Sequence, residues 1–120
     1  MAYTYGMLET RVTVVETKGF SARAKGRMDA VEVDRAIEVI ARDPLCGDLI
    51  QGTGGIRKLR FAVKGKGKSG GVRIAYYYYN ESMPVFLLTV FAKNEKADLT
   101  RAERNALGRV ARTLRETYGA

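Results

Sequence analysis

Residues 56–73 read IRKLRFAVKGKGKSGGVR, and the organisation of the whole chain follows from this stretch. It holds seven Lys and Arg residues and no Asp or Glu, so it carries most of the formal net charge of +8. Lys58 and Arg60 alternate with Leu59 and Phe61, which is typical of a strand with one polar and one apolar face. A Gly/Lys loop follows, and we expect the function to reside in this stretch.

Two further runs of strand-like sequence extend this stretch into a meander. We expect strands over residues 57–63, 72–80 and 85–91, joined by the Gly/Lys loop and then by Glu81-Ser82-Met83-Pro84. Residues 74–79 read IAYYYY and suit a central strand with one face on the helices and the other, the Arg73 face, partly open. Tyr76 and Tyr78 are predicted to pack in the core, whereas Tyr77 is a candidate for stacking on RNA bases.

The flanking segments predict one more strand and three helices. Residues 11–16 are β-branched and predict a strand, and a short helix is expected between residues 19 and 26. A longer amphipathic helix starts after Asp29 as N-cap and ends before Pro44. The last helix is strongly basic, and it starts at Asp98 or at Thr100, where the sequence has the capping-box pattern.

These elements predict one α+β domain over residues 1–120. We expect a compact, mainly antiparallel sheet of four to five strands packed on helices, with a C-terminal helix. Residues 1–10 show no clear periodicity and are expected to form a flexible N-terminal extension. At 120 residues the chain is long enough to bury a core without disulfides.

Composition excludes several classes of function. There is no histidine and a single cysteine, Cys46, so His-dependent triads and most transition-metal sites are excluded, and we expect neither a metal nor another cofactor. No apolar run approaches the ~20 residues of a membrane span. The N-terminus lacks a basic region followed by an apolar core, so no signal peptide is expected. These features favour a cytoplasmic protein without a membrane partner.

The clustered positive charge favours a polyanionic partner, most simply nucleic acid. Lys58, Arg60 and Arg73 lie on adjacent predicted strands and converge if the register places them on one face. Lys93 and Lys96, just after the last strand, could border the same patch. The alternative is a basic surface that serves only solubility.

The Gly/Lys loop formally matches two phosphate-loop patterns, G-x-G-x-x-G and a variant of Walker A. Both patterns work only where the loop opens a helix, and a strand is predicted here. We therefore expect a flexible hairpin loop whose Lys64, Lys66 and Lys68 contact RNA phosphates. Saturable nucleotide binding and a merely solvated loop are the alternatives.

The run GDLIQGTGGIRKLRFAVKGKGKSGGVRIAYYYY, then PVFLLTVFAKNEKADLT and a basic C-terminal helix, resembles the RelE/HigB toxins of type II toxin–antitoxin modules. The resemblance covers residues 12–118 and is strongest to HigB-like members. It implies a compact sheet with helices on one side and a ribosome-dependent mRNA endoribonuclease, or mRNA interferase, that inhibits translation. It also implies the 70S ribosome with mRNA as target and a HigA-like antitoxin with a helix-turn-helix domain. Operator DNA would be bound only by the toxin–antitoxin complex.

The resemblance also assigns roles to residues. It implies metal-independent attack of a ribose 2′-hydroxyl on the scissile phosphate, with Arg73 and Arg60 offsetting phosphoryl charge. Lys58, or in second place Lys93, would be the base. The RNA- or ribosome-binding set is then Arg57, Lys64, Lys66, Lys68, Lys96 and Tyr77. Asn94 and Thr100 depart from the family pattern, where an arginine and a tyrosine are found, and a non-catalytic RNA-binding module is the alternative function.

Overall fold

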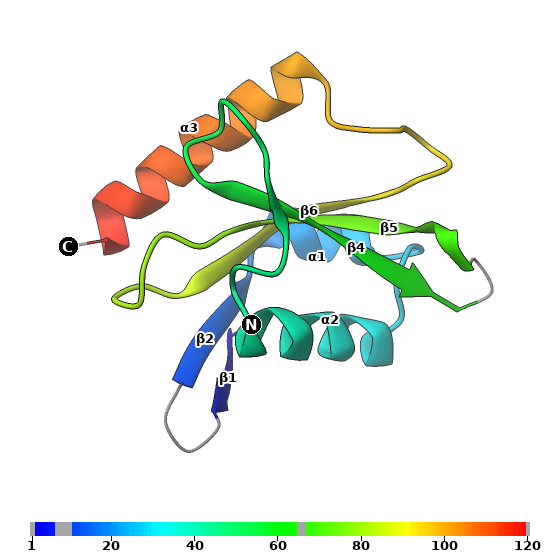
Figure 1. Ribbon diagram of the computed structural model, residues 1–120, viewed down its shortest axis with the longest axis horizontal. Coiled ribbons are helices and arrows are strands. Elements are labelled where there is room, and N and C mark those ends of the chain that lie inside the picture. The colour runs from blue at the N-terminus through cyan, green and yellow to red at the C-terminus, as the bar shows by residue number, and fades with distance from the viewer. Residues whose placement is uncertain (1, 7–10, 65–66, 120) are drawn as a thin grey trace.

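A six-stranded sheet with the order β1-β2-β6-β5-β4-β3 forms the centre of the part of the chain that the structure describes (Figure 1). The computed structural model describes the backbone of residues 2–6, 11–64 and 67–119, and the side chains of residues 12–64 and 71–119. The strands are β1 (Ala2–Gly6), β2 (Arg11–Glu16), β3 (Asp48–Leu49), β4 (Ile56–Val63), β5 (Gly67–Tyr77) and β6 (Val85–Ala92). The helices are α1 (Lys18–Ala24), α2 (Ala30–Arg42) and α3 (Arg101–Tyr118).

The sheet is mixed, because β2 and β6 run parallel while the other neighbouring strands are antiparallel. The predicted α+β fold with a mainly antiparallel sheet and a C-terminal helix is confirmed. Two short edge strands, β1 and β3, raise the strand number above the predicted four to five.

Strand β1 corrects the expectation of an extension without regular structure over residues 1–10. Ala2 pairs with Val15 and Gly6 with Arg11, so five residues of this segment lie in an antiparallel ladder with β2. Such an edge strand is held by the free backbone groups of its neighbour, and these leave no periodic signature in its own sequence. Sequence patterning therefore missed it.

The helix starts follow local capping chemistry. The Thr17 side chain accepts a hydrogen bond from the Phe20 N–H at the start of α1. Asp29 with Glu32, and Thr100 with Glu103, form complete capping boxes at the starts of α2 and α3. These boxes confirm the predicted N-caps, with Thr100 rather than Asp98 at α3.

The helices cover both faces of the sheet, which corrects the implied arrangement with all helices on one side. Figure 1 shows α3 above the sheet and α2 below it. One core lies under α1 and α2 and contains Phe20, Ile37, Ile74 and Tyr76. A second, smaller core lies under α3 and contains Ile56, Ala75, Tyr77, Phe86, Leu88 and Ala111. The strand meander is thus buried on both sides over part of its length.

A β-bulge in β6 changes which residues face α3. Ala75 pairs with Thr89 whereas Tyr76 pairs with Leu87, so Leu88 is an extra residue in β6. Leu87 packs in the α1/α2 core and Leu88 in the α3 core. After the bulge, Phe91 pairs with Arg73 and shares its face.

The β4–β5 hairpin differs from the predicted one. β5 begins at Gly67 and ends at Tyr77, so Lys68 belongs to a strand and not to a loop, and residues 78–80 leave the sheet. The pairing is irregular between Phe61 and Val63, where β4 approaches Gly71 closely. A Cβ atom at Gly71 would lie 2.3 Å from the Phe61 carbonyl oxygen, so only glycine fits there without a shift of the backbone.

Candidate RNA-binding and catalytic site

The register of β4, β5 and β6 places three predicted site residues on the α3 face. Arg60 and Arg73 are direct Cα partners, and Arg73 is in turn the partner of Phe91. Lys58 is the partner of Ala75, one row further along the same face. The predicted convergence of Lys58, Arg60 and Arg73 is therefore confirmed.

The two arginines of this row differ in exposure, and neither has a carboxylate partner among the described side chains. Arg73 is only 6% exposed and its Nη1 donates to the Val72 carbonyl oxygen at 3.2 Å, while Arg60 is exposed. None of the ion pairs among the described side chains involves either residue. Like charges directly opposite on neighbouring strands are destabilising. The described contacts therefore leave the charges of this pair without a neutralising carboxylate.

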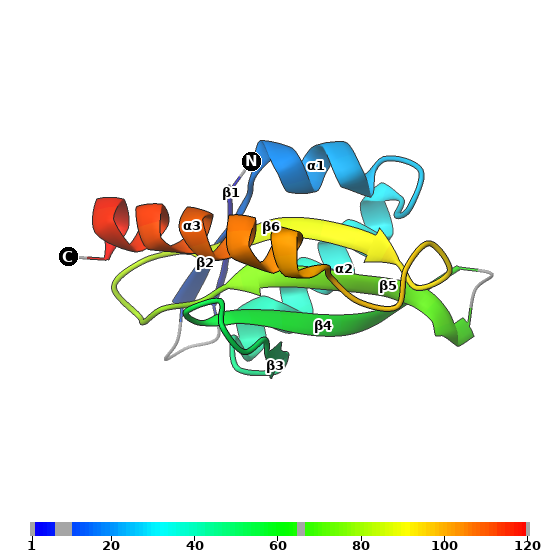
Figure 2. The same ribbon diagram turned by 90° about the horizontal axis from the view of Figure 1, so that it is seen from above.

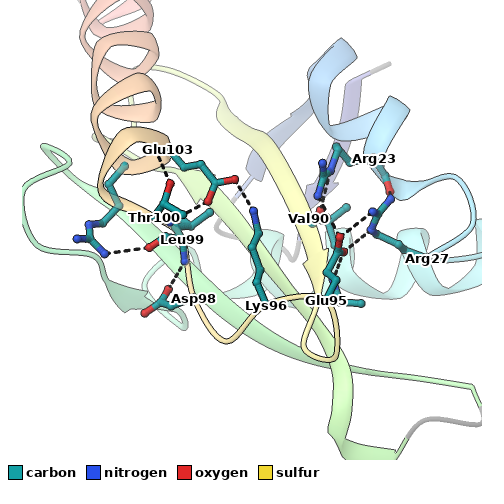
Figure 3. A network of polar contacts seen from close by, with 11 residues as sticks. Arg23, Arg27, Val90, Glu95, Lys96, Asp98, Leu99, Thr100 and Glu103 are labelled. Atoms are coloured by element: carbon teal, nitrogen blue, oxygen red, sulfur yellow. Dashed lines mark hydrogen bonds and ion pairs between the residues drawn. The ribbon is translucent and has the colours of Figure 1, made fainter.

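The loop between β6 and α3 brings Lys96 to the face of the arginine row and Asp98 next to Lys58 of β4 (Figure 3). The Lys96 ammonium lies 5.2 Å from the centroid of the Phe91 ring and forms an ion pair with Glu103. The Lys58 Nζ donates to Asp98 Oδ1 at 3.0 Å. The two lysines thus flank the arginine row, each held by one carboxylate.

These lysines affect the pKa values of their carboxylate partners. Burial raises the pKa of the Asp98 carboxyl, but hydrogen bonds from Lys58 and the Leu99 N–H, with the Arg104 charge, outweigh it and hold that pKa below its usual range. The hydrogen bond from Lys96, with that from the Thr100 N–H, lowers the pKa of Glu103. Both carboxylates are therefore ionised at neutral pH, and the two ion pairs are fully formed.

The same loop is anchored to α1 on its other side by Glu95 (Figure 3). Arg27 donates to both Glu95 carboxylate oxygens, at 2.6 and 3.0 Å, and Arg23 lies 3.5 Å away. The Ala92 N–H donates to Glu95 Oε1 at 2.6 Å. The hydrogen bonds from Arg27 and then Ala92 lower the pKa of Glu95 to about 2. Consecutive residues of this loop thus contact α1 and α3.

Lys93 is connected to the row only through its backbone in the described contacts. Its backbone N–H donates to the Gly71 carbonyl oxygen at 3.0 Å, which continues the pairing of β6 with β5. Its side chain is exposed and makes no described contact with Arg60, Arg73 or Lys58. Its catalytic role stays a prediction.

Two residues of the predicted RNA-binding set have structural roles instead. Arg57 lies on the opposite face, where its Nη1 donates to the carbonyl oxygens of Leu45 at 3.2 Å and Gly47 at 2.8 Å. Tyr77 is 0% exposed in the core under α3, so its ring cannot stack on a base. The prediction of base stacking by Tyr77 is therefore wrong, whereas RNA or ribosome binding by Arg57, away from the row, stays a prediction.

The three lysines around the Gly/Lys turn do not join the row in the described part of the chain. The Lys64 N–H donates to Glu32 of α2, which lies in the opposite layer. Lys66 lies outside the described residues, and so does the side chain of Lys68. β5 follows the turn directly, so no helix N-terminus is present to bind a nucleotide phosphate. The predicted strand after this sequence is confirmed, and the absence of nucleotide binding stays a prediction.

A groove of about 660 Å³ adjoins the row on the side of β3. Its charged lining residues are Asp48, Lys58, Asp98 and Arg104. Sequence reasoning missed Asp98 and Arg104 as parts of the site. Asp98 is 40 residues from Lys58, so no local pattern predicts their contact. The basic periodicity of the last helix was the only available signal for Arg104.

Two negative findings concern the described residues alone. They contain no group of three or more His, Cys, Asp or Glu side chains that could hold a metal ion. Among their helices, none combines the length and the apolar character that crossing a membrane requires.

The structure is a small α+β domain in which Arg60 and Arg73 pair across two strands and form no ion pair with a described carboxylate. Residues 12–119 match the family model described as the RelE toxin of the RelE/RelB toxin–antitoxin system. The chain therefore belongs to the RelE toxin family, and this membership implies an antitoxin partner. The toxin family expected from the sequence is confirmed, and the HigB-like assignment stays a prediction.

Proposed function

We propose that the protein is a ribosome-dependent mRNA endoribonuclease that stops translation in the cytoplasm. Its membership of the RelE toxin family supports this proposal. The observation that carries it is the directly paired Arg60 and Arg73, which have no carboxylate partner among the described side chains. Arginines on directly opposite positions of two strands can both reach the oxygens of one phosphodiester.

In the proposed reaction the 2′-oxygen of a ribose attacks the adjacent phosphorus atom and loses its proton. The bond from phosphorus to the 5′-oxygen breaks, and that oxygen takes up a proton. The products are a 2′,3′-cyclic phosphate and a 5′-hydroxyl. Arg60 and Arg73 offset the negative charge that grows on the phosphoryl oxygens, and such electrostatic stabilisation is often the largest contribution to catalysis.

The proton transfers are assigned differently from the sequence-based expectation. A basic, uncharged Lys58 would need neighbouring cations, but its ammonium contacts the Asp98 carboxylate at 3.0 Å. We therefore propose that Lys58 stays an ammonium and donates a proton to the leaving 5′-oxygen. Lys93, which has no carboxylate contact among the described residues, is proposed as the base. The ribosome would orient the mRNA, and orientation alone is worth several kcal/mol, about 7–11 at best.

The antitoxin is proposed to be a HigA-like protein with a helix-turn-helix domain. The toxin would then reach operator DNA only through this complex. A small reading frame next to the gene that encodes a helix-turn-helix protein would support this proposal, and copurification of its product with the toxin would test it.

Induced expression with primer-extension mapping of mRNA ends tests the proposed activity. Wild-type protein should arrest growth and cut mRNA within codons, and the cuts should disappear when translation is blocked. Arg60→Ala should abolish both effects, because it removes one guanidinium from the row. Arg35→Ala, which removes an exposed arginine from α2, is the matched control and should behave as wild type. Undiminished mRNA cleavage by Arg60→Ala would contradict the catalytic role of Arg60.

One observation favours a second candidate function, a non-catalytic RNA- or ribosome-binding module. Lys58 and Lys96 are both engaged by carboxylates, so neither is free to act as a base. This module would arrest growth or bind ribosomes without creating new mRNA ends. The same mapping experiment separates the two candidates.

A further inference from the structure

A second basic site lies on α3, away from the Arg60–Arg73 row. It is a pocket of about 290 Å³ between α3 and the turn that precedes β4. Arg109, Arg112 and Arg115 line its helical side, and Gly52 and Gly54 line the other. The three arginines recur at intervals of three residues, so they lie along one side of the helix over about 9 Å.

The turn and the helix approach each other closely because both lack side chains at the contact. A Cβ atom at Gly108 of α3 would lie 3.6 Å from the Thr53 carbonyl oxygen. Gly52 and Gly54 have φ of 81° and 76°, a left-handed conformation that favours glycine. Thr53 is buried and its Oγ1 donates to the Ile50 carbonyl oxygen and accepts from the Ile56 N–H. The pocket therefore has a fixed, bare backbone wall.

Arg115 is held in place before any ligand binds. Its Nη1 donates to the Tyr77 hydroxyl at 3.3 Å, and its guanidinium carbon lies 5.6 Å from the centroid of the Tyr79 ring. These contacts orient the guanidinium group without neutralising its charge. Arg109 and Arg112 are exposed and extend from the same side of the helix.

No acidic side chain among the residues that the structure describes lines the pocket. None of the ion pairs among the described side chains involves Arg109, Arg112 or Arg115. Glu116 lies one turn beyond Arg112 but forms no ion pair with it in the described chain. Three unpaired guanidinium groups beside an exposed glycine turn form a site for an anion with several oxygens, such as a phosphodiester.

The pocket adjoins the groove next to the candidate catalytic site at Gly52. Gly52 lines both this pocket and the groove that contains Lys58 and Arg104. Positive groups thus run from Arg115 along α3 to Arg104 and Lys58, and Arg60 lies on the Lys58 face of β4. From Arg104 to Arg115 the helix spans about 16 Å, which is longer than a single phosphate site requires.

We propose that the pocket formed by Gly52, Gly54, Arg109, Arg112 and Arg115 binds phosphates of an RNA strand that continues from the Arg60–Arg73 row. The direction of the strand rests on the proposed function, whereas the binding of RNA by this pocket does not. The pocket holds the strand by its backbone, so it adds affinity and salt dependence without sequence preference.

Fluorescence anisotropy with a short labelled 2′-O-methyl RNA tests the proposal, because this RNA lacks the attacking hydroxyl and cannot be cleaved. The double variant Arg109→Ala/Arg112→Ala should weaken binding about ten-fold at ~0.1 M salt and reduce the salt slope by about 1.4. Lys18→Ala/Arg35→Ala removes two exposed charges from α1 and α2 and should change affinity less than about two-fold. Arg109→Lys/Arg112→Lys should give an intermediate loss of RNA affinity, because lysine keeps the charge but cannot donate the two parallel hydrogen bonds of a guanidinium group.

An equal loss in the pocket and control variants, at unchanged thermal midpoints, would overturn the proposal in favour of general charge. Pocket-dependent binding of polyglutamate with pocket-independent binding of RNA would also overturn it, and would assign the pocket to an acidic protein. If mRNA cleavage is absent but the pocket variant still loses RNA affinity, the proposed function fails and this site stands. If cleavage is present and the variant binds RNA normally, only this proposal fails.

Discussion

The face of the sheet under α1 and α2 is closed by apolar side chains, whereas the opposite face is apolar only where α3 packs on it. Figure 2 shows α3 along one end of the sheet, with the other ends of β4 and β5 left without a helix. Lys58, Arg60 and Arg73 lie on that second face. One face of the sheet thus supplies the larger core. On the other face, one part packs against α3 and another part carries the basic residues.

Two arginines of β4 show what this difference means for a single side chain. Arg57 points to the α1/α2 face, where it binds the carbonyl oxygens of Leu45 and Gly47. Arg60 points to the α3 face, where it is exposed and lies opposite Arg73. The same residue type thus holds a loop on one face and is exposed, without a described carboxylate partner, on the other.

Core truncation should give the largest difference between the faces. Ile37→Ala removes a fully buried side chain under α2 and should lower the free energy of unfolding by about 2–5 kcal/mol. Leu107→Ala removes a half-buried side chain of α3 and should cost about 1–2 kcal/mol. Urea denaturation of both variants checks this prediction. Equal losses would contradict the view that the α1/α2 core is dominant.

The two neighbouring tyrosines of β5 provide a smaller test. The Tyr76 hydroxyl donates to the Pro44 carbonyl oxygen and accepts from the Gly47 N–H, both at 2.8 Å. Tyr76→Phe leaves a buried N–H without a partner and should cost about 1–3 kcal/mol. Tyr77→Phe removes one 3.3 Å contact with Arg115 and should cost about 0.5–1.5 kcal/mol. Thermal or urea unfolding measures both, and a larger loss for Tyr77→Phe would reverse the comparison.

The two β4 arginines should differ in their effect on stability. Arg57→Gln loses the bonds to two carbonyl oxygens and should lower the free energy of unfolding by about 1 kcal/mol. Arg60→Gln removes a like-charge contact and should leave stability unchanged or raise it by up to about 0.5 kcal/mol. Denaturation at low salt measures both variants. A destabilised Arg60→Gln would show that Arg60 has a structural role.

The smallest effect concerns pH and the loop that links the two faces. Arg27 holds the pKa of Glu95 at about 2, below the usual 4.5, so an unfolded chain takes up this proton at higher pH than the folded one. The stability that Glu95 contributes is therefore complete above about pH 4.5 and is lost as the pH falls toward 2. Glu95→Gln should be less stable than wild type at neutral pH. The two proteins should converge in acid-unfolding curves, and a constant difference down to pH 2 would contradict this prediction.

The sequence predicted the row and the helix starts because both depend on local spacing. Lys58 and Arg60 alternate within one strand, and the capping boxes at Asp29 and Thr100 are complete within four residues. The same alternation places Arg57 on the opposite face, so its assignment to the site conflicted with the pattern itself.

Contacts between distant segments could not be predicted in this way. The face of Tyr77 was right, but its burial depends on α3, which begins more than twenty residues later in the chain. Lys58 meets Asp98 across 40 residues, and β1 is held by β2 rather than by a pattern of its own. The fold class and the charge pattern could therefore be predicted from the sequence, whereas the contact partners of each charged side chain could not.

Because Leu88 is an extra residue in β6, the side chains after it alternate out of step with those before it. Leu87 and Phe91 are four residues apart, so strict alternation without a bulge would place Phe91 on the face of Leu87, toward α1 and α2. With it, the Phe91 ring lies under the Lys96 ammonium and beside Arg73. A deletion of Leu88 would remove the bulge and leave Phe91 opposite Arg73, whereas loss of the bulge with Leu88 retained would turn every later β6 side chain to the opposite face. The bulge thus determines on which side of the sheet the aromatic ring beside the basic row lies.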